Sequence, residues 1–366
     1  MPPLRRRLAL GAVLAVSLIL AATMLRLALE WRQALADLDS MIVTPAAIDL
    51  PTELPLAADP VVPADGTPAT EAPVSAPPTV PQSVASSPPD EAPGLSTETL
   101  SVLLLGTDAR AEDTEPTRTD AIVLVRIARD TGRVSMLSIP RDLWVPYAGG
   151  GEGRINAAYA IGEKRYGPGG GAVVAKATVA RLVGVDVDNF VLINFQGFET
   201  LIDQLGGITV DVPEALYDPA YPTADYQTIE VRFRAGPQHM DGERALIYAR
   251  TRHADSDFGR NQRQQLVLMA IFDRIRERGL LQQLTSLDDY TGALRGYVQT
   301  DLSRSRMLEV AGFARGVSPD DVLRYAIDSS AIVELRDPAT FAAEPRALRR
   351  LVSQFTGSAI STAGGE

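Results

Sequence analysis

Hydrophobic and polar positions follow two periods along the middle of the chain, and each period predicts its own kind of element. Short β-prone apolar stretches predict strands over residues 100–108, 119–128, 133–142, 189–195 and 208–212. Apolar residues at helical spacing, closed by glycines, predict helices over residues 154–167, 171–184 and 196–207. Elements that alternate in this way are typical of α/β domains. We therefore expect a central mixed sheet with helices on both faces, and the strand order stays open.

Helical patterns dominate the rest of the chain. Residues 241–252 predict a helix with Asp241 as its N-cap, because an aspartate there can accept a hydrogen bond from a free backbone N–H. A long amphipathic helix is predicted over residues 260–279, opening at Arg260. The C-terminal part adds two or three helices, one of them over residues 300–315, and a short strand-like stretch at 329–335.

An uncharged apolar run from Leu8 to Leu25 follows three consecutive arginines. Its 18 residues are enough for a helix to span a bilayer. Because arginines precede the run and acids follow it, we expect a single-pass anchor within residues 1–30, with the N-terminus in the cytoplasm and the remaining chain outside the cell membrane. A cleavable signal peptide, cut near Ala21 and Ala22, is the alternative. The run exceeds the usual apolar region of such peptides, about 7–15 residues, which favours the uncleaved anchor.

Residues 31–98 are predicted to form a disordered spacer. Residues 44–94 hold 13 of the 26 prolines, and such a stretch cannot sustain a helix or pack a core. Ten acids lie between residues 37 and 98, where there is no Lys or Arg. This segment therefore accounts for nearly all of the formal net charge of −11.

One folded domain is expected over residues 99–357, with its core motifs at 100–280, a helical part at 281–357 and a disordered tail at 358–366. The chain has no cysteine, so an exported domain must be stabilised by its core without disulfides. A domain of this length can bury such a core.

The residue inventory excludes several chemistries. A thiol nucleophile is impossible without cysteine, and two histidines, His239 and His253, leave little scope for a usual zinc site or a Ser-His-Asp triad. Carboxylates, arginines and hydroxyls remain. That set suits phosphate chemistry assisted by a hard cation.

Two acids mark strand ends. Asp108 follows the strand-like "LLLG", and Asp120 begins the next apolar run. Paired carboxylates at adjacent strand ends would bind Mg²⁺ and leave its other positions to water and phosphate. The alternative is that Asp108 caps a turn and Asp120 only flanks a strand.

Arginines gather at the ends of predicted elements: Arg118, Arg141, Arg250, Arg252 and Arg260. For any one of them, an ion pair with a nearby acid is the alternative explanation, as for Arg141 with Asp142 or Arg252 with Asp255 or Asp257. The five together favour an anion site, because element ends are where α/β folds gather ligands. Gln264 lies four residues after Arg260 and so on the same helix face.

Six motifs occur in a fixed order: "LLLGTDAR", "RTDAIVLVRI", "MLSIPRDLWV", "RINAAYA", "FQGFETLIDQLGGITVDVP" and "GPQHMDGERALIYARTRHADSDFGRNQRQQ". Over nearly all of residues 100–280 they resemble the LytR-CpsA-Psr family of envelope proteins. The resemblance implies a membrane-anchored bacterial phosphotransferase. Such an enzyme moves a glycopolymer, for example a teichoic acid, capsule or other secondary wall polymer, from a polyprenyl pyrophosphate carrier to peptidoglycan.

The resemblance also assigns roles to residues. It implies that Asp108 and Asp120 hold Mg²⁺ and that the five arginines above bind the pyrophosphate, with Gln264 beside them. We expect Asp108, Asp120 and Arg141 to be catalytic, and Asp108 is the candidate for accepting the proton of the attacking hydroxyl. Arg154 occupies a position that is often lysine in the family and ranks lower, since the two cations differ in geometry.

The carrier lipid requires an apolar groove. The predicted helices at 155–165 and 173–183, packed on the sheet, could form it, because their alanines leave room: Ala157, Ala158, Ala160, Ala172 and Ala175. Close packing of these helices on the sheet explains the same small residues equally well.

Other functions stay open at this point. The same site would serve a pyrophosphatase that hydrolyses the carrier lipid, or a non-catalytic receptor for a lipid-linked glycan that regulates wall enzymes. A nucleic-acid partner is disfavoured by the external location and by the lack of a convincing basic recognition helix. The oligomeric state is not defined by the sequence.

Overall fold

The computed structural model describes residues 32–48, 50, 99–110, 113, 115–223, 227–252, 257–277, 287–335 and 340–357. The predicted anchor, most of the predicted spacer and the C-terminal tail lie outside these ranges. Within them, no helix is both long and apolar enough to span a bilayer.

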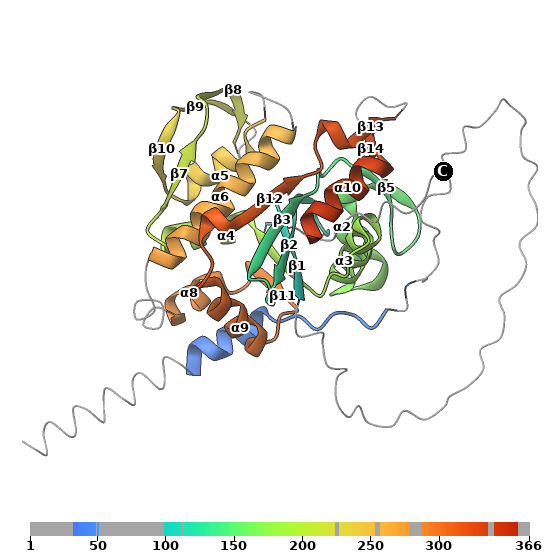
Figure 1. Ribbon diagram of the computed structural model, residues 1–366. Coiled ribbons are helices and arrows are strands. Elements are labelled where there is room, and N and C mark those ends of the chain that lie inside the picture. Colours follow the sequence, from blue (N-terminus) through green and yellow to red (C-terminus); the bar gives the residue numbers. More distant parts are fainter. Residues whose placement is uncertain are drawn as a thin grey trace, which may run out of the picture.

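A six-stranded sheet forms the centre of the molecule (Figure 1). Its strands, in spatial order, are β11 (Val298–Thr300), β6 (Asn189–Asn194), β1 (Thr99–Thr107), β2 (Thr119–Ala128), β3 (Arg133–Ser138) and β12 (Val322–Ala326). The β1–β6 and β3–β12 pairs are parallel, and the other three pairs are antiparallel. The prediction of a mixed sheet is therefore confirmed.

Strand β1 shows why helices cover both faces of the sheet. Leu103 and Leu105 point into one apolar cluster, whereas Val102 and Leu104 point into the apolar clusters on the opposite face. The first face is covered by α2 (Ala158–Tyr166), α3 (Gly170–Val183) and α10 (Pro345–Thr356), and the second by α6 (Asp257–Glu277) and α9 (Arg304–Ala314). Alternating burial along a strand requires cover on both sides.

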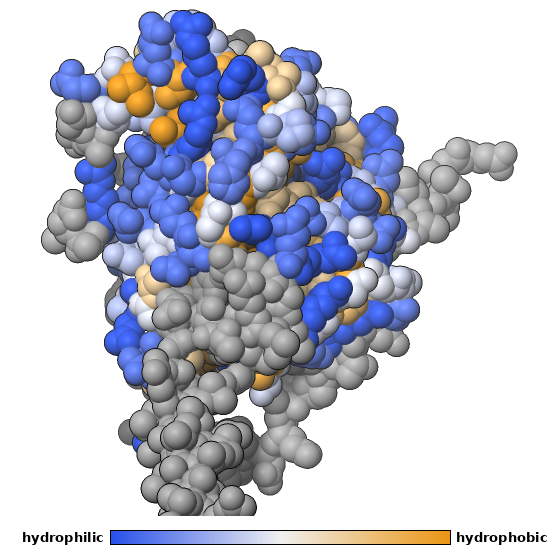
Figure 2. Space-filling view, turned by 90° about the vertical axis from the view of Figure 1, so that its left-hand side faces the viewer, coloured by the Kyte–Doolittle hydropathy of each residue, from blue (hydrophilic) through white to orange (hydrophobic). Residues whose placement is uncertain are grey.

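A smaller layer lies beyond α6. It contains α4 (Phe195–Gln204), α5 (Gly242–Arg250), the β7–β10 pair (Ile208–Val212 and Gly236–Met240) and the β8–β9 hairpin (Leu216–Pro222 and Thr228–Phe233). Asp241 caps α5 as predicted, since its side chain accepts a hydrogen bond from the Arg244 N–H. The outer face carrying these elements is mostly hydrophilic, with hydrophobic side chains gathered near its top (Figure 2). Ile229 of β9, 43% exposed, is among the exposed apolar residues.

Several element boundaries differ from the sequence prediction. Strand β3 ends at Ser138 and not at residue 142, because Pro140 and Arg141 enter a turn. Arg154 lies in strand β5 (Glu152–Arg154), paired with β4 (Trp144–Pro146), and the helix expected from residue 154 begins as a 3-10 turn at Ile155 and continues as α2. The C-terminal part is not only helical. It supplies both edge strands of the central sheet, β11 and β12, besides α8 (Leu287–Leu294) and the β13–β14 pair (Ile332–Glu334 and Phe341–Ala343).

The packing of α2 on α3 overturns the prediction of a lipid groove at these helices. A Cβ atom added to Gly162 would lie 2.5 Å from the Gly170 carbonyl oxygen, and one added to Gly171 would lie 2.6 Å from the Tyr159 carbonyl oxygen. Glycines therefore bring the two helices into backbone contact. Ala158 and Ala172 are buried in the same core cluster, so the small residues serve close packing.

The predicted spacer is partly wrong. Its first part, residues 32–48, is described and forms a helix over residues 32–41. Ala34 and Met41 are buried, 1% and 5% exposed, and Leu50 packs against the core cluster that includes α3. Burial of apolar side chains against the domain outweighs the polar composition of the segment.

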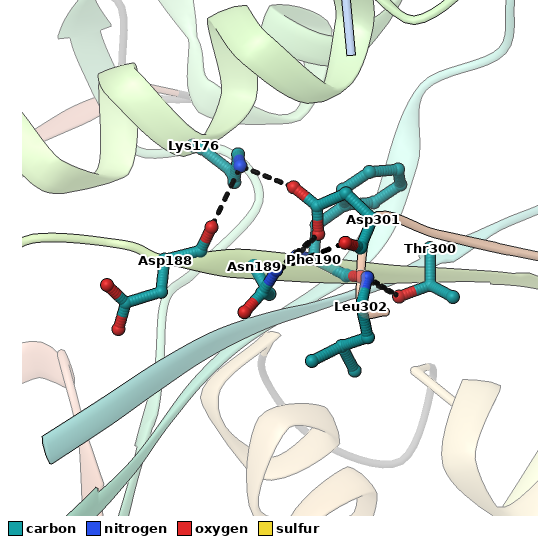
Figure 3. A network of polar contacts seen from close by, with 7 residues as sticks. All are labelled: Lys176, Asp188, Asn189, Phe190, Thr300, Asp301 and Leu302. Carbon is teal, nitrogen blue, oxygen red and sulfur yellow. Dashed lines mark hydrogen bonds and ion pairs between the residues drawn. The ribbon is translucent and has the colours of Figure 1, made fainter. Parts of the chain in front are cut away.

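A buried ion pair fastens the β11 edge of the sheet to helix α3 (Figure 3). The ammonium group of Lys176 lies 2.5 Å from Asp301 Oδ2 and donates to the Asp188 carbonyl oxygen at 3.0 Å. The other carboxylate oxygen of Asp301 accepts the backbone N–H of Phe190 at 2.8 Å. One aspartate thus joins the segment after β11, strand β6 and α3.

Candidate active site

Asp108 and Asp120 come together because strands β1 and β2 are antiparallel neighbours. Thr107 pairs with Thr119 across the ladder, after a bulge at Gly106 and Thr107. The Thr107 hydroxyl lies 2.5 Å from that of Thr117 and donates to the Arg118 carbonyl oxygen at 3.1 Å. These bonds close the base of the connection between the strands. The acids that follow Thr107 and Thr119 are therefore held at the same end of the sheet.

Arg141 joins Asp120 to Asp142. Its Nη1 atom lies 2.5 Å from Asp120 Oδ1, and its Nε atom lies 3.4 Å from Asp142 Oδ2. Arg154 Nη1 lies 3.4 Å from the other Asp142 oxygen. Ion pairs therefore join the four side chains in the order Asp120, Arg141, Asp142 and Arg154. The carboxylates fix the direction of both arginines.

The turn that carries Arg141 is itself fixed by backbone hydrogen bonds. The Leu143 N–H donates to the Pro140 carbonyl oxygen at 3.1 Å, and the Asn156 N–H donates to the Arg141 carbonyl oxygen at 3.1 Å. Leu143 is fully buried. The expectation that a strand end holds Arg141 is therefore replaced by a turn anchored on both sides of the arginine.

Arg250, the last residue of α5, approaches the site from the opposite direction. Its Nη2 atom lies 3.8 Å from Asp108 Oδ2, and its guanidinium carbon lies 4.2 Å from the centre of the Phe195 ring. Its Nη1 atom also donates to the Tyr221 hydroxyl at 3.4 Å. A guanidinium that is stacked on one ring and bonded to another aromatic residue is restricted to one orientation.

Partial burial raises the pKa of the Asp108 carboxyl above its ordinary value of 3.8. The charges of Arg250 and Arg110 act in the opposite direction, and the negative charge of Asp120 adds to the rise. Because desolvation outweighs the nearby arginines, the carboxylate is destabilised where it stands. A cation placed beside Asp108 would therefore stabilise its ionised form.

Replacing Asp108 by Asn is expected to make the protein more stable at pH 7. A raised pKa in the folded state means that ionisation of Asp108 costs stability as the pH rises through that pKa, and Asn avoids this cost. The gain should vanish below pH 3.8, where the carboxyl is neutral in both states. Thermal unfolding midpoints across this pH range measure it. Asp130→Asn, an exposed acid in the turn between β2 and β3, is the control, and an Asp108→Asn midpoint at pH 7 no higher than that of wild type would contradict the expectation.

Helix α6 brings Arg260 and Gln264 to the site from its first turns. The helix begins at Asp257, three residues before the predicted start, so Arg260 lies within the first turn and is 2% exposed. Arg263 fastens α6 to the end of α5, because its Nε atom donates to the Tyr248 carbonyl oxygen at 3.1 Å. The two helices that carry Arg250 and Arg260 are thereby held together.

A cavity of about 960 Å³ connects these groups. Its lining includes the predicted site residues Asp120, Arg141, Arg250, Arg252, Arg260 and Gln264. Most of the remaining wall is apolar and comes from β1, β2, β6, α4, α5, α6 and the β8–β9 hairpin. The charged groups therefore lie in a cavity whose other walls are made of hydrocarbon.

Three predicted site residues lie outside the cavity wall. Asp108 reaches it through Arg250, and Arg154 through Asp142 and Arg141. Arg118 is exposed beside them. Of the two acids considered as partners of Arg252, Asp255 lies outside the described residues and Asp257 is the first residue of α6.

The aromatic side of the site, formed by Phe195 and Tyr221, has no clear signal in the sequence. Phe195 is the last residue of the predicted strand at 189–195 but is the first residue of α4 in the structure, and Tyr221 lies in a hairpin whose strand pattern is interrupted by Pro219. Asp142, expected to hold Arg141 or to line the mouth of the site, pairs with Arg141 and also lies on the cavity wall. Its second ion pair, with Arg154, depends on the β4–β5 hairpin, which no local pattern indicated.

The fit of the site to Mg²⁺ depends on its two carboxylates, Asp108 and Asp120. The described residues contain no cluster of three or more His, Cys, Asp or Glu side chains that could hold a metal. Asp120 is close enough to Asp108 for its negative charge to raise the pKa of the Asp108 carboxyl. Two carboxylates suit Mg²⁺, which keeps several waters and completes its shell with substrate phosphates.

Comparison with known proteins identifies the family. The family model described as "LytR_cpsA_psr family" matches residues 72–343. The chain belongs to the LytR_cpsA_psr family. The family match includes the central sheet, α6 and every residue of the site described above.

Relatives in the LytR_cpsA_psr family include two transferases of Bacillus subtilis (strain 168). The polyisoprenyl-teichoic acid–peptidoglycan teichoic acid transferase TagT is 36% identical over 210 residues, which are 56% of this chain and 61% of TagT. The transferase TagV is 34% identical over 191 residues, which are 51% of this chain and 46% of TagV. The chain thus spans about half to three fifths of the length of these relatives.

Solved structures of similar proteins share the fold. The crystal structure of B. subtilis TagV superposes with a TM-score of 0.58 at 26% identity, covering 72% of this chain and 100% of the TagV chain. The structure of TagT bound to LI-WTA has a TM-score of 0.55 at 27% identity, covering 71% of this chain and 90% of the TagT chain. The fold of the LytR_cpsA_psr domain is therefore retained in this chain.

Proposed function

We propose that this protein transfers a glycopolymer phosphate from a polyprenyl-pyrophosphate carrier to a hydroxyl group of peptidoglycan. The observation that carries the proposal is the cavity that has arginines and carboxylates at one part of its wall and hydrocarbon along the rest. A polyprenyl pyrophosphate likewise has a charged group at one end and a long apolar chain at the other. The transferase names of the LytR_cpsA_psr relatives TagT and TagV support the same reaction class.

The arginines provide the charge stabilisation that phosphoryl transfer requires. In such reactions the protein contributes mainly positioning and electrostatic stabilisation. Arg141 and Arg250 are each held in direction by a carboxylate, and Arg260 is buried at the start of α6. Guanidinium groups fixed in this way can each bind two phosphate oxygens and orient the phosphorus for attack.

The reaction proposed is a displacement at the phosphorus next to the sugar. The oxygen of a peptidoglycan hydroxyl forms a bond to this phosphorus, the bond from phosphorus to the bridging oxygen breaks, and polyprenyl phosphate leaves. The hydroxyl proton passes to a carboxylate, and Asp108 suits this role because its pKa is raised. When bound by Asp108 and Asp120, Mg²⁺ would neutralise charge on the pyrophosphate.

The cavity is the site proposed for the polyprenyl chain. Leu268 of α6 lies on its wall. Leu268→Trp is expected to raise KM for a donor with a long polyprenyl chain by roughly tenfold or more, because each methylene kept out of an apolar site costs about 0.8 kcal/mol. KM for a short-chain donor should change little. Leu308→Trp, at a residue on α9 that is 61% exposed, is the matched control, and equal effects on both donors would contradict a lipid site here.

The membrane is the proposed location of the protein, with residues 1–30 as anchor and the domain outside the cell. This follows from the apolar run and the arginines before it. The proposal also agrees with a donor whose polyprenyl chain reaches the cavity from the bilayer.

A product assay tests the function. The full-length chain in detergent is incubated with a polyprenyl-pyrophosphate-linked oligosaccharide, peptidoglycan fragments and Mg²⁺, and the products are analysed by mass spectrometry. We expect a glycan–phosphate–peptidoglycan adduct that is absent with Asp120→Ala or after removal of divalent ions with EDTA. Free glycan phosphate without adduct would indicate a pyrophosphatase, and tight lipid binding without turnover would indicate a receptor.

A further inference from the structure

The helix over residues 32–41 is seated on the catalytic domain by three positions at helical spacing. Ala34 and Met41 are 1% and 5% exposed, and Asp37 between them is 5% exposed. These residues lie three and four positions apart, so they occupy one face of the helix. The face is as buried as a core element of the domain.

Two ion pairs fix this helix to elements near the end of the chain. Arg295, after α8, pairs with Asp37, and Arg304, at the start of α9, pairs with Asp39. Arg304 also donates to the Leu35 carbonyl oxygen at 3.3 Å. The pair of Asp37 with Arg295 makes the docking of the helix specific. If the helix docked elsewhere, the buried carboxylate of Asp37 would have no arginine beside it.

The chain stays on the domain after the helix. Ile42 forms a parallel bridge with Thr300 of β11, and the Val43 N–H donates to the Thr300 carbonyl oxygen at 2.8 Å. Residues 44–46 then pass close to Gly169, the residue directly before α3. A Cβ atom added to Gly169 would lie 3.1 Å from the Thr44 carbonyl oxygen. Leu50 ends the run against the core cluster.

These contacts change the role of the proline-rich segment. Both residues that flank this segment are fixed to the domain, since Leu50 packs against the core cluster and Thr99 is the first residue of β1. A segment fixed to the same body at both ends cannot separate that body from the membrane. Only residues 26–31 lie between the apolar run and the docked helix.

The difference in reach is large. As an extended tether of proline-rich chain, residues 51–98 would let the domain stand up to about 150 Å from its anchor, at about 3.1 Å per residue. Residues 26–31 span at most about 20 Å even when fully extended. The position of the cavity above the bilayer therefore depends on the short connection.

We propose that residues 32–48 and Leu50 form a collar that holds the catalytic domain at one height and orientation above the membrane, and that the connection from Leu50 to Thr99 does not determine that height. The proposal rests on the proposed membrane anchor and lipid-linked donor. With the collar docked, the cavity is held at the height where it can take up a carrier from the bilayer. Asp37 and Ala34 are the positioning residues of this arrangement.

Cleavage between Leu50 and Thr99 tests the collar without any assay of activity. A protease recognition sequence is placed between Gly66 and Thr67 of the full-length chain, which carries an affinity tag at its N-terminus and is kept in detergent. After complete cleavage, we expect the domain to remain on the affinity resin through the docked collar. Release of the wild-type domain by cleavage alone would overturn the proposal, because that is the behaviour of a tether.

Two matched substitutions show whether the packed face of the helix is responsible. Ala34→Asp places a charge on the buried face, and Ala36→Asp places the same charge on an exposed position two residues away. After cleavage, most of the Ala34→Asp domain should be released, whereas Ala36→Asp should be retained like wild type. Asp37→Ala provides a second test that inserts no charge. Retention of both Ala34→Asp and Asp37→Ala would contradict the assigned interface.

An insertion at two places tests the consequence for the reaction. A flexible Gly/Ser segment of about 20 residues is inserted either between Ala28 and Leu29 or between Gly66 and Thr67, and the protein is placed in phosphatidylethanolamine and phosphatidylglycerol vesicles that contain the polyprenyl-pyrophosphate-linked oligosaccharide. We expect the first insertion to lower transfer at least severalfold and the second to leave it unchanged. Equal effects would overturn the proposal. If the whole stretch from the anchor to Thr99 were one tether, an insert would lengthen it equally at either place.

A donor dispersed in detergent separates this proposal from the proposed function. There, both insertion variants should transfer at the wild-type rate, because no bilayer fixes the donor. If no variant, including wild type, turns over the detergent-dispersed donor, the proposed function fails. The cleavage experiment would still decide the collar.

Discussion

Arg141→Lys is expected to lower kcat for glycopolymer transfer by about 10²-fold, the size of effect seen when one fixed donor to a developing charge is lost. Lysine keeps the positive charge. It lacks the planar fork that allows Arg141 to meet Asp120 through Nη1 and Asp142 through Nε at the same time. Initial rates at saturating donor concentration measure the change, together with the thermal unfolding midpoint.

The control for Arg141→Lys is Arg129→Lys. Arg129 also pairs with a carboxylate, that of Glu309, but it follows β2 at the end opposite Asp120 and does not line the cavity. It should keep its kcat. If Arg141→Lys loses stability in parallel with activity, Arg141 is chiefly a structural ion pair, and the proposed role in transfer is wrong.

Asp301→Ala is expected to lower the free energy of unfolding by about 3–5 kcal/mol, because breaking one side of a buried ion pair leaves the other charge without compensation. Asp301 is 6% exposed at its side chain and accepts from both Lys176 and the Phe190 N–H. Its loss would loosen α3, β6 and the β11 edge together. Urea unfolding followed by far-UV circular dichroism measures the effect.

The matched change to Asp301→Ala is Asp211→Ala, an exposed aspartate in strand β7. Its effect should stay within about 0.5 kcal/mol, as is usual at exposed positions. Asp301→Asn should lie between the two, since an amide oxygen can still accept from the Phe190 N–H. An Asp301→Ala protein as stable as the Asp211→Ala protein would mean that water replaces the lost partner.

Local patterns in the sequence predicted the inner strands of the sheet well. Strand β2 was predicted over the residues it occupies, and β1 was displaced by one residue, because both strands are long and apolar. The edge strand β12 was missed. It is short, its residues Leu323 and Arg324 are exposed, and it is defined by pairing with β3 almost two hundred residues earlier. Pairing between residues so far apart in the chain produces no pattern in the local sequence of β12.

The collar was missed for a different reason. Its buried positions, Ala34, Asp37 and Met41, follow helical spacing, but the middle one is an acid. A hydrophobic pattern cannot show a buried aspartate, whose burial depends on Arg295 far along the chain. The acidic composition of the segment therefore predicted a solvated spacer.

The structure brings most of the predicted site residues together. Their positions at element ends explain only part of this arrangement. The sequence placed Asp120 and Arg141 at element ends, and the structure joins them directly. It could not locate the cavity. The alanines taken as its lining pack α2 and α3 onto the opposite face of the sheet, and the cavity lies between β1, β2, β6 and α4–α6.

The two fixed ends of the proline-rich segment, Leu50 and Thr99, have a consequence for how this protein can diverge. Lengthening a connection between two fixed ends is inexpensive, since each doubling of its length adds only about 0.6 kcal/mol of closure entropy. Insertions and deletions within residues 51–98 should therefore accumulate nearly freely in descendants of this gene. In residues 26–31 every added residue would move the cavity relative to the bilayer, so selection should hold that connection to a constant number of residues while its neighbour drifts.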